Sequence, residues 1–190
     1  MIIRDAKPSD AEFLAKSVMA GMHFYDFETD IPKNKDIYQR LVECEQRDDS
    51  LYTYANSRVA EIEGVVAGAI LAYPGENYKD LRRRTFTELW PDLKSVDTNS
   101  EQETGPGEFY IDTLAVHPSF RGHGVAQALV SDAIRRGGEL GYNKITLIAD
   151  PALPHLIKLY SKLGFTMADQ RHAFGVDFQR MAYFLDKRFF

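Results

Sequence analysis

Apolar residues recur along the chain with two spacings, one typical of amphipathic helices and one typical of strands. Helical spacing covers residues 9–21, 33–47, 122–140 and 153–163. Strand-like runs cover residues 2–4, 53–63, 65–73, 109–116, 144–149, 165–171 and 179–185. Two of these runs meet at Glu63 and Gly64, which predicts a hairpin. Because hairpins alternate with strand–helix–strand units, the order predicts an α/β (α+β) domain with a mixed sheet flanked by helices.

Two local patterns in the first helices bear on structure and on chemistry. Ser9 and Glu12 have the spacing of a capping box, so the first helix is expected to open at this point. In the second helix, Cys44 falls in phase with Ile37 and Leu41. We therefore interpret Cys44 as a small buried hydrophobic residue rather than a catalytic nucleophile.

One connection is much longer than the others. Pro74–Gly107 joins two predicted strands, whereas most connections hold roughly 4 to 6 residues. Its first half predicts a short helix stopped by Pro91, with the apolar residues Tyr78, Leu81, Phe86, Leu89 and Trp90. The second half, Asp97–Gly107, has no apolar anchor and is expected to be mobile. The segment is either a tolerated surface insertion or a lid that shapes the substrate site.

Length and charge limit the classes of function. The chain has 190 residues, which suits one domain over residues 1–190. Its 23 basic and 28 acidic side chains give a net charge of -5, which argues against a nucleic-acid partner. No apolar stretch approaches the roughly 20 residues that span a bilayer, so no membrane association is expected. A charged start and a single cysteine predict a cytoplasmic protein without disulfides.

The polar residues with catalytic potential give no sign of a metal. The five histidines lack metal-ligand spacing, and no metal site is expected. His117 and His123 are interpreted as solvated turn residues. Arg82, Arg83 and Arg84 are interpreted as one charged helix face rather than a binding patch.

Small residues follow the strand 109–116 at the start of the helix 122–140. Gly122, Gly124 and Ala126 leave the backbone open to close approach, and free N–H groups at a helix start bind anions. Arg121 adds a cationic fork that can face the same anion. A Rossmann loop needs a third glycine where Gln127 stands, and a P-loop needs a Gly-Lys-Ser/Thr ending that this loop lacks. The pattern predicts a phosphate cradle, but one for neither a dinucleotide nor a nucleoside triphosphate.

Two motifs carry a resemblance to a known family. Arg121, Gly124 and Ala126 match the signature Arg/Gln-x-x-Gly-x-Gly/Ala of the GNAT superfamily of acyl-CoA-dependent N-acyltransferases. The run 159–165, with Tyr160 and a closing Gly-Phe, looks like the second signature of that family. The resemblance covers nearly the whole chain and implies a central sheet of about seven strands, splayed between the fourth and fifth. It also implies about four helices. The inserted helical segment 74–107 comes in addition to them.

By this resemblance the co-substrate is acetyl-CoA, with no metal. The loop that would hold the pyrophosphate comprises Arg121, Gly122, His123, Gly124, Val125 and Ala126. Leu114, Ala115 and Val116 would hydrogen-bond the pantetheine arm, and Tyr160 would lie near the thioester sulfur. The chain departs from the family pattern where Leu153 replaces a frequent asparagine and Leu156 replaces a usual alanine.

The implied reaction requires three roles. An alkyl amine is mostly ammonium at neutral pH, so a base or a water chain must take its proton before it attacks the thioester directly. The Val116 N–H is the candidate donor to the tetrahedral oxyanion, and the Tyr160 hydroxyl is the candidate acid for the leaving thiolate. The alternative for Tyr160 is a packed core aromatic.

Strand alternation suggests candidates for the base. It places Glu108, Tyr110 and Asp112 on one face of the strand 109–116. The other face would carry Phe109, Ile111 and Ala115. Asp112 or Glu108 is the candidate base if its surroundings raise its pKa, whereas the alternative for Asp112 is a hydrogen bond to a loop.

We therefore expect an acetyl-CoA-dependent N-acetyltransferase that acts on a primary amine. Acidic residues at and near the long connection, Asp92, Asp97, Glu101 and Glu103, favour a small cationic amine or a peptide amine, but solvated charge explains them equally well. A non-catalytic acyl-CoA-binding sensor is the alternative, and a homodimer is left open.

Overall fold

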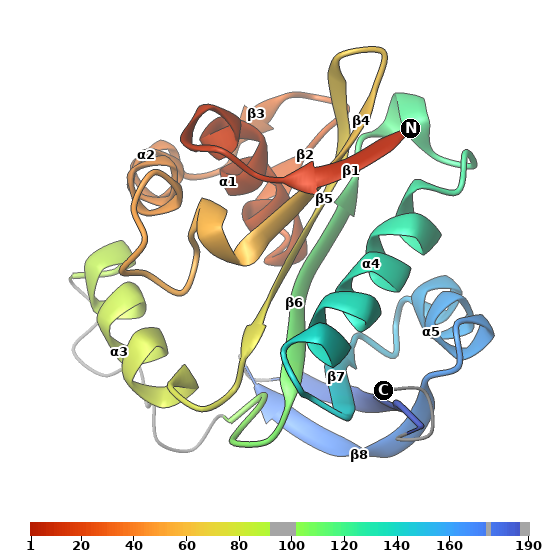
Figure 1. Cartoon of the computed structure of the whole chain (residues 1–190). Coiled ribbons are helices and arrows are strands. Elements are labelled where there is room, and N and C mark those ends of the chain that lie inside the picture. Colours follow the sequence, from red (N-terminus) through yellow and green to blue (C-terminus); the bar gives the residue numbers. More distant parts are fainter. Residues whose placement is uncertain (92–101, 174–175, 187–190) are drawn as a thin grey trace.

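The computed structural model describes residues 1–91, 102–173 and 176–186, and it is built around one large sheet (Figure 1). The strand order in this sheet is β1-β4-β5-β6-β7-β9-β8. Its strands are β1 Ile2–Asp5, β4 Ser57–Ile62, β5 Val65–Pro74, β6 Phe109–Val116, β7 Lys144–Ala149, β8 Thr166–Ala173 and β9 Val176–Phe184. Only β6 and β7 pair in parallel in the described part of the sheet. The predicted mixed sheet of seven strands is confirmed.

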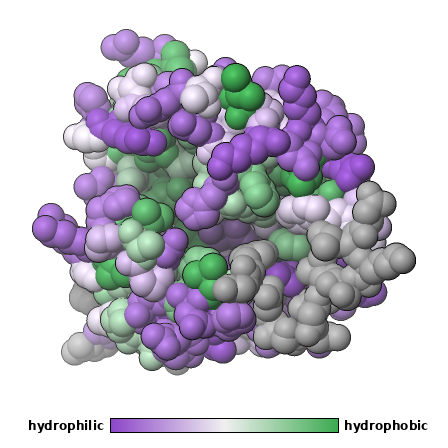
Figure 2. Space-filling model, turned by 180° about the vertical axis from the view of Figure 1, so that it is seen from behind, coloured by the Kyte–Doolittle hydropathy of each residue, from purple (hydrophilic) through white to green (hydrophobic). Residues whose placement is uncertain are grey.

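Helices cover both faces of the sheet. They are α1 Ala11–Gly21, α2 Lys35–Glu45, α3 Tyr78–Leu89, α4 Val125–Glu139 and α5 Pro154–Lys162. Helices α1, α2 and α3 lie on one face, and α4 and α5 lie on the other (Figure 1). Each face has its own apolar cluster, and in both clusters the buried side chains come from helices and strands together. Seen from behind, the surface is largely hydrophilic, with hydrophobic residues scattered among the hydrophilic ones (Figure 2).

Several local expectations are confirmed and others are wrong. The Glu63-Gly64 turn closes the β4–β5 hairpin with positive φ at both residues, as predicted. Cys44 is buried, and burial raises the pKa of its thiol to about 11, so it stays protonated. The capping box of Ser9 and Glu12 does not form. Instead, the Lys7 N–H donates to the Asp10 carboxylate at 2.8 Å ahead of α1.

Short elements also differ from the apolar pattern. The strand expected from residue 53 begins at Ser57, because Tyr54–Asn56 forms a 3-10 turn whose start is capped by the Thr53 hydroxyl. The connection between α1 and α2 contains a small hairpin, β2 Tyr25–Asp26 and β3 Ile31–Pro32, which the sequence pattern did not predict. Two-residue strands give too little alternation to be recognised.

A bulge in β6 changes which side chains share a face. Pairing with β5 passes from Leu71↔Thr113 to Ala72↔Ile111, so Asp112 is the extra residue. Ala115 therefore pairs with Ala69 and lies on the side of α1, and its predicted place beside Phe109 and Ile111 is wrong. Leu114 and Val116 join the Phe109 cluster instead.

The sheet opens between β6 and β7. Their ladder covers only Phe109–Ile111 against Ile145–Leu147, while β6 continues along β5 as far as Val116. This separation confirms the expected splay between the fourth and fifth strands of the sheet. Asp112 is the first residue of β6 that no longer pairs with β7.

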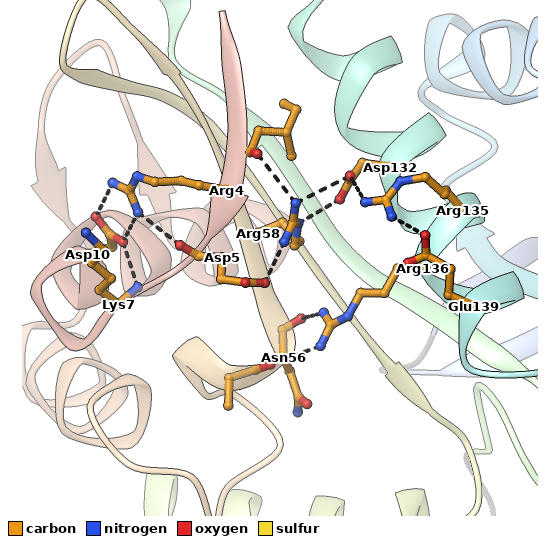
Figure 3. Close-up of polar contacts among 12 residues, drawn as sticks. Arg4, Asp5, Lys7, Asp10, Asn56, Arg58, Asp132, Arg135, Arg136 and Glu139 are labelled. Carbon is orange, nitrogen blue, oxygen red and sulfur yellow. Dashed lines mark hydrogen bonds and ion pairs between the residues drawn. The ribbon is translucent and has the colours of Figure 1, made fainter.

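A polar network holds α4 against the first strands (Figure 3). The Arg58 Nε on β4 donates to Asp132 Oδ2 on α4 at 2.7 Å, and its Nη1 reaches Asp5 at 2.5 Å. Farther along α4, Arg136 donates to the Ala55 carbonyl at 3.2 Å. Because Arg58 and Asp132 are largely shielded from water, removing one partner would leave a costly unpaired charge. The network therefore fixes the helix that begins at the candidate loop.

Candidate active site

The glycine loop forms an open helix start. The chain leaves β6 at Val116, makes a 3-10 turn at Pro118–Phe120 and enters α4 at Val125. Gly122 and Gly124 have φ of +80° and +76°, a region that favours glycine. Gly124 is the N-cap and supplies no side-chain acceptor.

The free N–H groups of α4 lie on this loop. The Ala128 N–H bonds to the Gly124 carbonyl at 3.0 Å. The N–H groups of Val125, Ala126 and Gln127 precede that bond and have no partner within the helix. Arg121 and His123 are exposed on the same loop, as expected for His123. These features suit a phosphate group, which would neutralise the positive end of the helix dipole.

The backbone of β6 offers hydrogen-bonding groups on its open side. The His117 N–H donates to the Ala67 carbonyl at 2.9 Å. Because bonded and non-bonded pairs alternate in antiparallel ladders, the N–H groups of Val116 and Leu114 point away from β5, toward the splay. Ala115 instead pairs its backbone with Ala69. Of the three predicted pantetheine contacts, Leu114 and Val116 therefore have the open backbone groups.

Tyr160 lies in the apolar cluster that also contains Leu114 and Val116. Its ring meets Phe165 edge-on at 5.9 Å, and only 6% of the residue is exposed. Burial raises the pKa of its hydroxyl to about 12, so the phenol keeps its proton at neutral pH. The structure thus places the second motif on the same face of the sheet as Leu114 and Val116.

The end of α5 explains the closing glycine of that motif. Gly164 has φ of +93°, and a Cβ there would lie 2.9 Å from the Tyr183 ring. At the other end of α5, Leu153 is the N-cap and makes no side-chain capping bond, while Leu156 packs against the apolar cluster.

Asp112 stands where β6 leaves β7. Its carboxylate accepts hydrogen bonds from the Tyr73 hydroxyl at 2.5 Å and the Thr113 hydroxyl at 2.9 Å. Burial raises the pKa of Asp112 to about 7, and the carboxylate of Glu103 adds to the rise. A carboxyl that titrates near neutrality is suited to accept a proton at physiological pH.

Glu108 has different surroundings. It accepts from Arg180, from Lys144 Nζ at 2.8 Å, and from the hydroxyls of Thr104 and Thr146 at 3.1 Å each. Although burial alone would raise its pKa, the bonds from Arg180 and Lys144 lower the pKa to about 2. Glu108 therefore joins β6, β7 and β9 as a stable carboxylate.

The second half of the long connection is anchored by polar groups. Asp97–Gly107 has no apolar residue, as expected, but Glu103 and Thr104 are buried, so polar side chains anchor this part of the segment. Glu103 accepts from the Tyr78 hydroxyl at 2.7 Å and from the Tyr110 hydroxyl at 2.6 Å. Asp92, Asp97 and Glu101 lie outside the described residues.

The arginine run and one histidine also differ from expectation. Arg82 is buried with its Nε 3.9 Å from Glu103, while Arg83 and Arg84 are exposed, so the three do not form one face. Successive helical residues point about 100° apart, which turns Arg82 inward. His117 is half-buried between the rings of Phe27 and Phe120 and is not a solvated turn residue.

Sequence reasoning missed a further buried carboxyl, Glu45, which acts on Asp112 electrostatically. Glu45 ends α2, is fully buried, and lines a small cavity together with Ser17, Ser57 and Thr113. Burial raises its pKa well above the usual range, and the charge of Asp112 adds to the rise. Its spacing of four from Leu41 is the signal that marks it as inward-facing.

The described ranges 1–91, 102–173 and 176–186 contain no cluster of three His, Cys, Asp or Glu side chains that would hold a metal ion. Within the same ranges, no helix combines the length and apolarity needed to cross a bilayer.

Comparisons with known proteins agree with these features. An N-alpha-acetyltransferase named MAK3, from Arabidopsis thaliana, is 32% identical over 122 residues, which is 56% of this chain and 63% of that protein. An N-acetyltransferase from Staphylococcus aureus Mu50 has the same fold, with a TM-score of 0.80 and 24% identity over 96% of this chain and all of that chain.

A further fold relative was solved with its cofactor. The structure of an acetyltransferase-like protein from Salmonella typhimurium with acetyl-CoA has a TM-score of 0.59 and 21% identity, over 99% of this chain and 95% of that chain. The family model described as Acetyltransferase (GNAT) family matches residues 22–165. With that match over most of its length, the chain belongs to the GNAT acetyltransferase family.

Proposed function

We propose that this protein transfers an acetyl group from acetyl-CoA to a primary amine. One observation carries the proposal: the backbone N–H groups of Leu114 and Val116 face the splay directly ahead of the open helix start at Gly124. An extended arm that ends in a pyrophosphate fits this continuous line of donors. A lone phosphate would use only the helix start.

Acetyl-CoA supplies an acyl group activated as a thioester. The N–H groups of Val125 and Ala126, with Arg121, would hold its pyrophosphate. Gly122, His123 and Gly124 would provide the close backbone approach, since no side chain fills the space where a Cβ of either glycine would lie. The open edge of β6 would hold the pantetheine as an added strand.

One proton-transfer residue lies on each face of the sheet: Asp112 acts as the base on one face, and Tyr160 acts as the acid on the other. Asp112 takes a proton from the acceptor ammonium, since its carboxyl is substantially ionised near pH 7. The amine nitrogen then attacks the carbonyl carbon, and the Val116 N–H donates to the oxygen that becomes negative. Tyr160 gives its proton to the departing sulfur as the carbon–sulfur bond breaks, and the nitrogen releases its second proton to water, which leaves a neutral amide. Glu108 is the weaker candidate base, because its low pKa leaves it little tendency to bind a proton.

The acceptor is a small cationic amine or a peptide amine. The Arabidopsis relative is named an N-alpha-acetyltransferase, which supports a peptide amine. Carboxyls on the face of α1–α3, among them Asp112 and Glu103, support a cation. We assign selection among acceptors to Pro74–Gly107, whose anchored end leads directly into β6. The cytoplasmic location and the homodimer stay predictions.

The test is a panel of amines: a polyamine, an amino sugar and a peptide with a free amino terminus. Each is incubated with acetyl-CoA, and free thiol is measured. Thiol release that depends on one class of amine supports the proposal. Tight CoA binding without amine-dependent release, for every member of a broad panel, would instead indicate the non-catalytic sensor.

A further inference from the structure

Three tyrosine hydroxyls bind two carboxylates on the face covered by α1, α2 and α3. Tyr73 stacks on Tyr78 with centroids 6.4 Å apart, and Tyr110 meets both rings edge-on at 5.8 and 6.4 Å. Glu103 and Asp112 bind hydroxyls of this tyrosine cluster (Tyr73, Tyr78 and Tyr110). The rings pack against one another, so their hydroxyls belong to one cluster from which both carboxylates accept hydrogen bonds.

The hydroxyls are divided unequally between the two carboxylates. Glu103 accepts from Tyr78 at 2.7 Å and from Tyr110 at 2.6 Å, whereas Tyr73 donates to Asp112. A carboxylate that collects several donors becomes a weaker base, because each hydrogen bond favours its ionised form. Glu103 thus occupies two donors that would otherwise be available within the same cluster.

We infer that Glu103, supplied by the long connection, is a positioning residue that keeps Asp112 basic by occupying the hydroxyls of Tyr78 and Tyr110 and by adding a like charge. The inference rests on the proposed function, in which Asp112 takes the proton from the amine. It gives the connection a role in the chemistry as well as in acceptor selection.

Other charged or titratable groups face Asp112 from the surrounding elements. Glu45 on α2, Tyr52 and Arg82 on α3 each interact electrostatically with Asp112, and the Arg82 Nε lies 3.9 Å from Glu103. Arg82 lowers the pKa of Asp112, opposite to the effect of Glu103. Variants that change Glu103 alone leave these groups in place, so a change in the Asp112 titration reports on Glu103.

The test is the pH dependence of kcat/KM in Glu103→Gln, with the best acceptor and saturating acetyl-CoA. Removing the like charge stabilises ionised Asp112, so the midpoint of the acidic limb is expected to fall by about one pH unit. A purely structural role would lower stability or overall rate without moving the midpoint. An unchanged midpoint in folded Glu103→Gln would overturn the inference.

Glu76→Gln is the matched control. Glu76 fixes the same connection by accepting from the Gly107 N–H at 3.0 Å and the Tyr142 hydroxyl at 2.7 Å, but it is exposed and is not among the main contributors to the pKa of Asp112. Its midpoint should stay at the parent value, and an equal shift in this variant would also count against the inference.

Two further variants keep the outcome decisive. If Glu103→Gln does not fold, Glu103→Asp is the second variant. It keeps the charge on a side chain shorter by one methylene, so the midpoint of the acidic limb is expected to fall by a smaller amount. A midpoint at or above the parent value would overturn the inference. If Asp112→Asn keeps the acidic limb of the parent pH profile of kcat/KM, the assignment of Asp112 as the base fails together with the inference. If Asp112→Asn loses the limb and Glu103→Gln keeps its midpoint, only the inference fails.

Discussion

The Tyr73 hydroxyl lies 2.5 Å from Asp112 Oδ2 at the residue where β6 separates from β7. The same residue is the extra one of the β6 bulge, so a local irregularity places a carboxyl on the α1–α3 side at the start of the splay. The glycine loop and Tyr160 belong to the opposite side, with α4 and α5. An acceptor and acetyl-CoA that approach from opposite faces would therefore meet at the splay.

Asp112→Asn should lower kcat by roughly 10² to 10⁴ fold, because the amide cannot take the proton of the ammonium. The sign of the pH dependence follows from the base being active when ionised. In the parent, kcat/KM should rise with pH through a midpoint near 7, the pKa of Asp112. Steady-state kinetics from pH 5 to 9 check both points, and a parent-like profile in Asp112→Asn would exclude Asp112 as the base.

Tyr160→Phe removes the candidate acid while keeping the ring that packs on Phe165. Turnover should fall by roughly 10² to 10⁴ fold, with CoA affinity nearly unchanged, since the hydroxyl acts on the leaving sulfur. Calorimetry and steady-state kinetics on the same preparation separate the two quantities. Turnover at the parent rate would mean that Tyr160 only packs.

Gly124→Val should weaken CoA binding strongly. A β-branched residue is strained at φ +76°, so the loop would rearrange and its N–H groups would lose their common direction. Gly141 provides the control: it also has positive φ, at +89°, but lies beyond the far end of α4. If calorimetry gives Gly124→Val the parent affinity while Gly141→Val is equally unaffected, the loop is not the CoA site.

Shortening the long connection between residues 92 and 101 should alter the ranking of acceptors and leave CoA binding intact. The deletion must spare Glu103 and Thr104, since both are buried and bonded to the core. KM values for a set of amines, with CoA affinity measured alongside, provide the test. Equal losses for all amines would argue against a selective role.

The sequence predicted the elements that repeat a simple pattern. The bounds of β6 and β7 agree with their strand-like runs, and the loop at Gly124 follows from glycines that precede a helix. The bulge at Asp112 was not predictable, because it depends on the register between β5 and β6 rather than on either strand alone.

The buried polar groups were harder to recognise from local sequence. Glu103 lies in a stretch without apolar neighbours, and its burial depends on Tyr78 and Tyr110, which approach through the fold. Asp112 was a candidate base from strand alternation, but its main partner, Tyr73, comes from another strand. Alternation indicates a face of a strand and says nothing of what covers it.

A single-turnover experiment with excess protein and acetyl-labelled acetyl-CoA tests the central claim, direct transfer to an amine, most directly. With the preferred amine present, the label should reach the amine at the rate at which free thiol appears, and none should remain on the protein. Label that accumulates on the protein before it reaches the amine, or thiol release without an acetylated amine, would contradict the account.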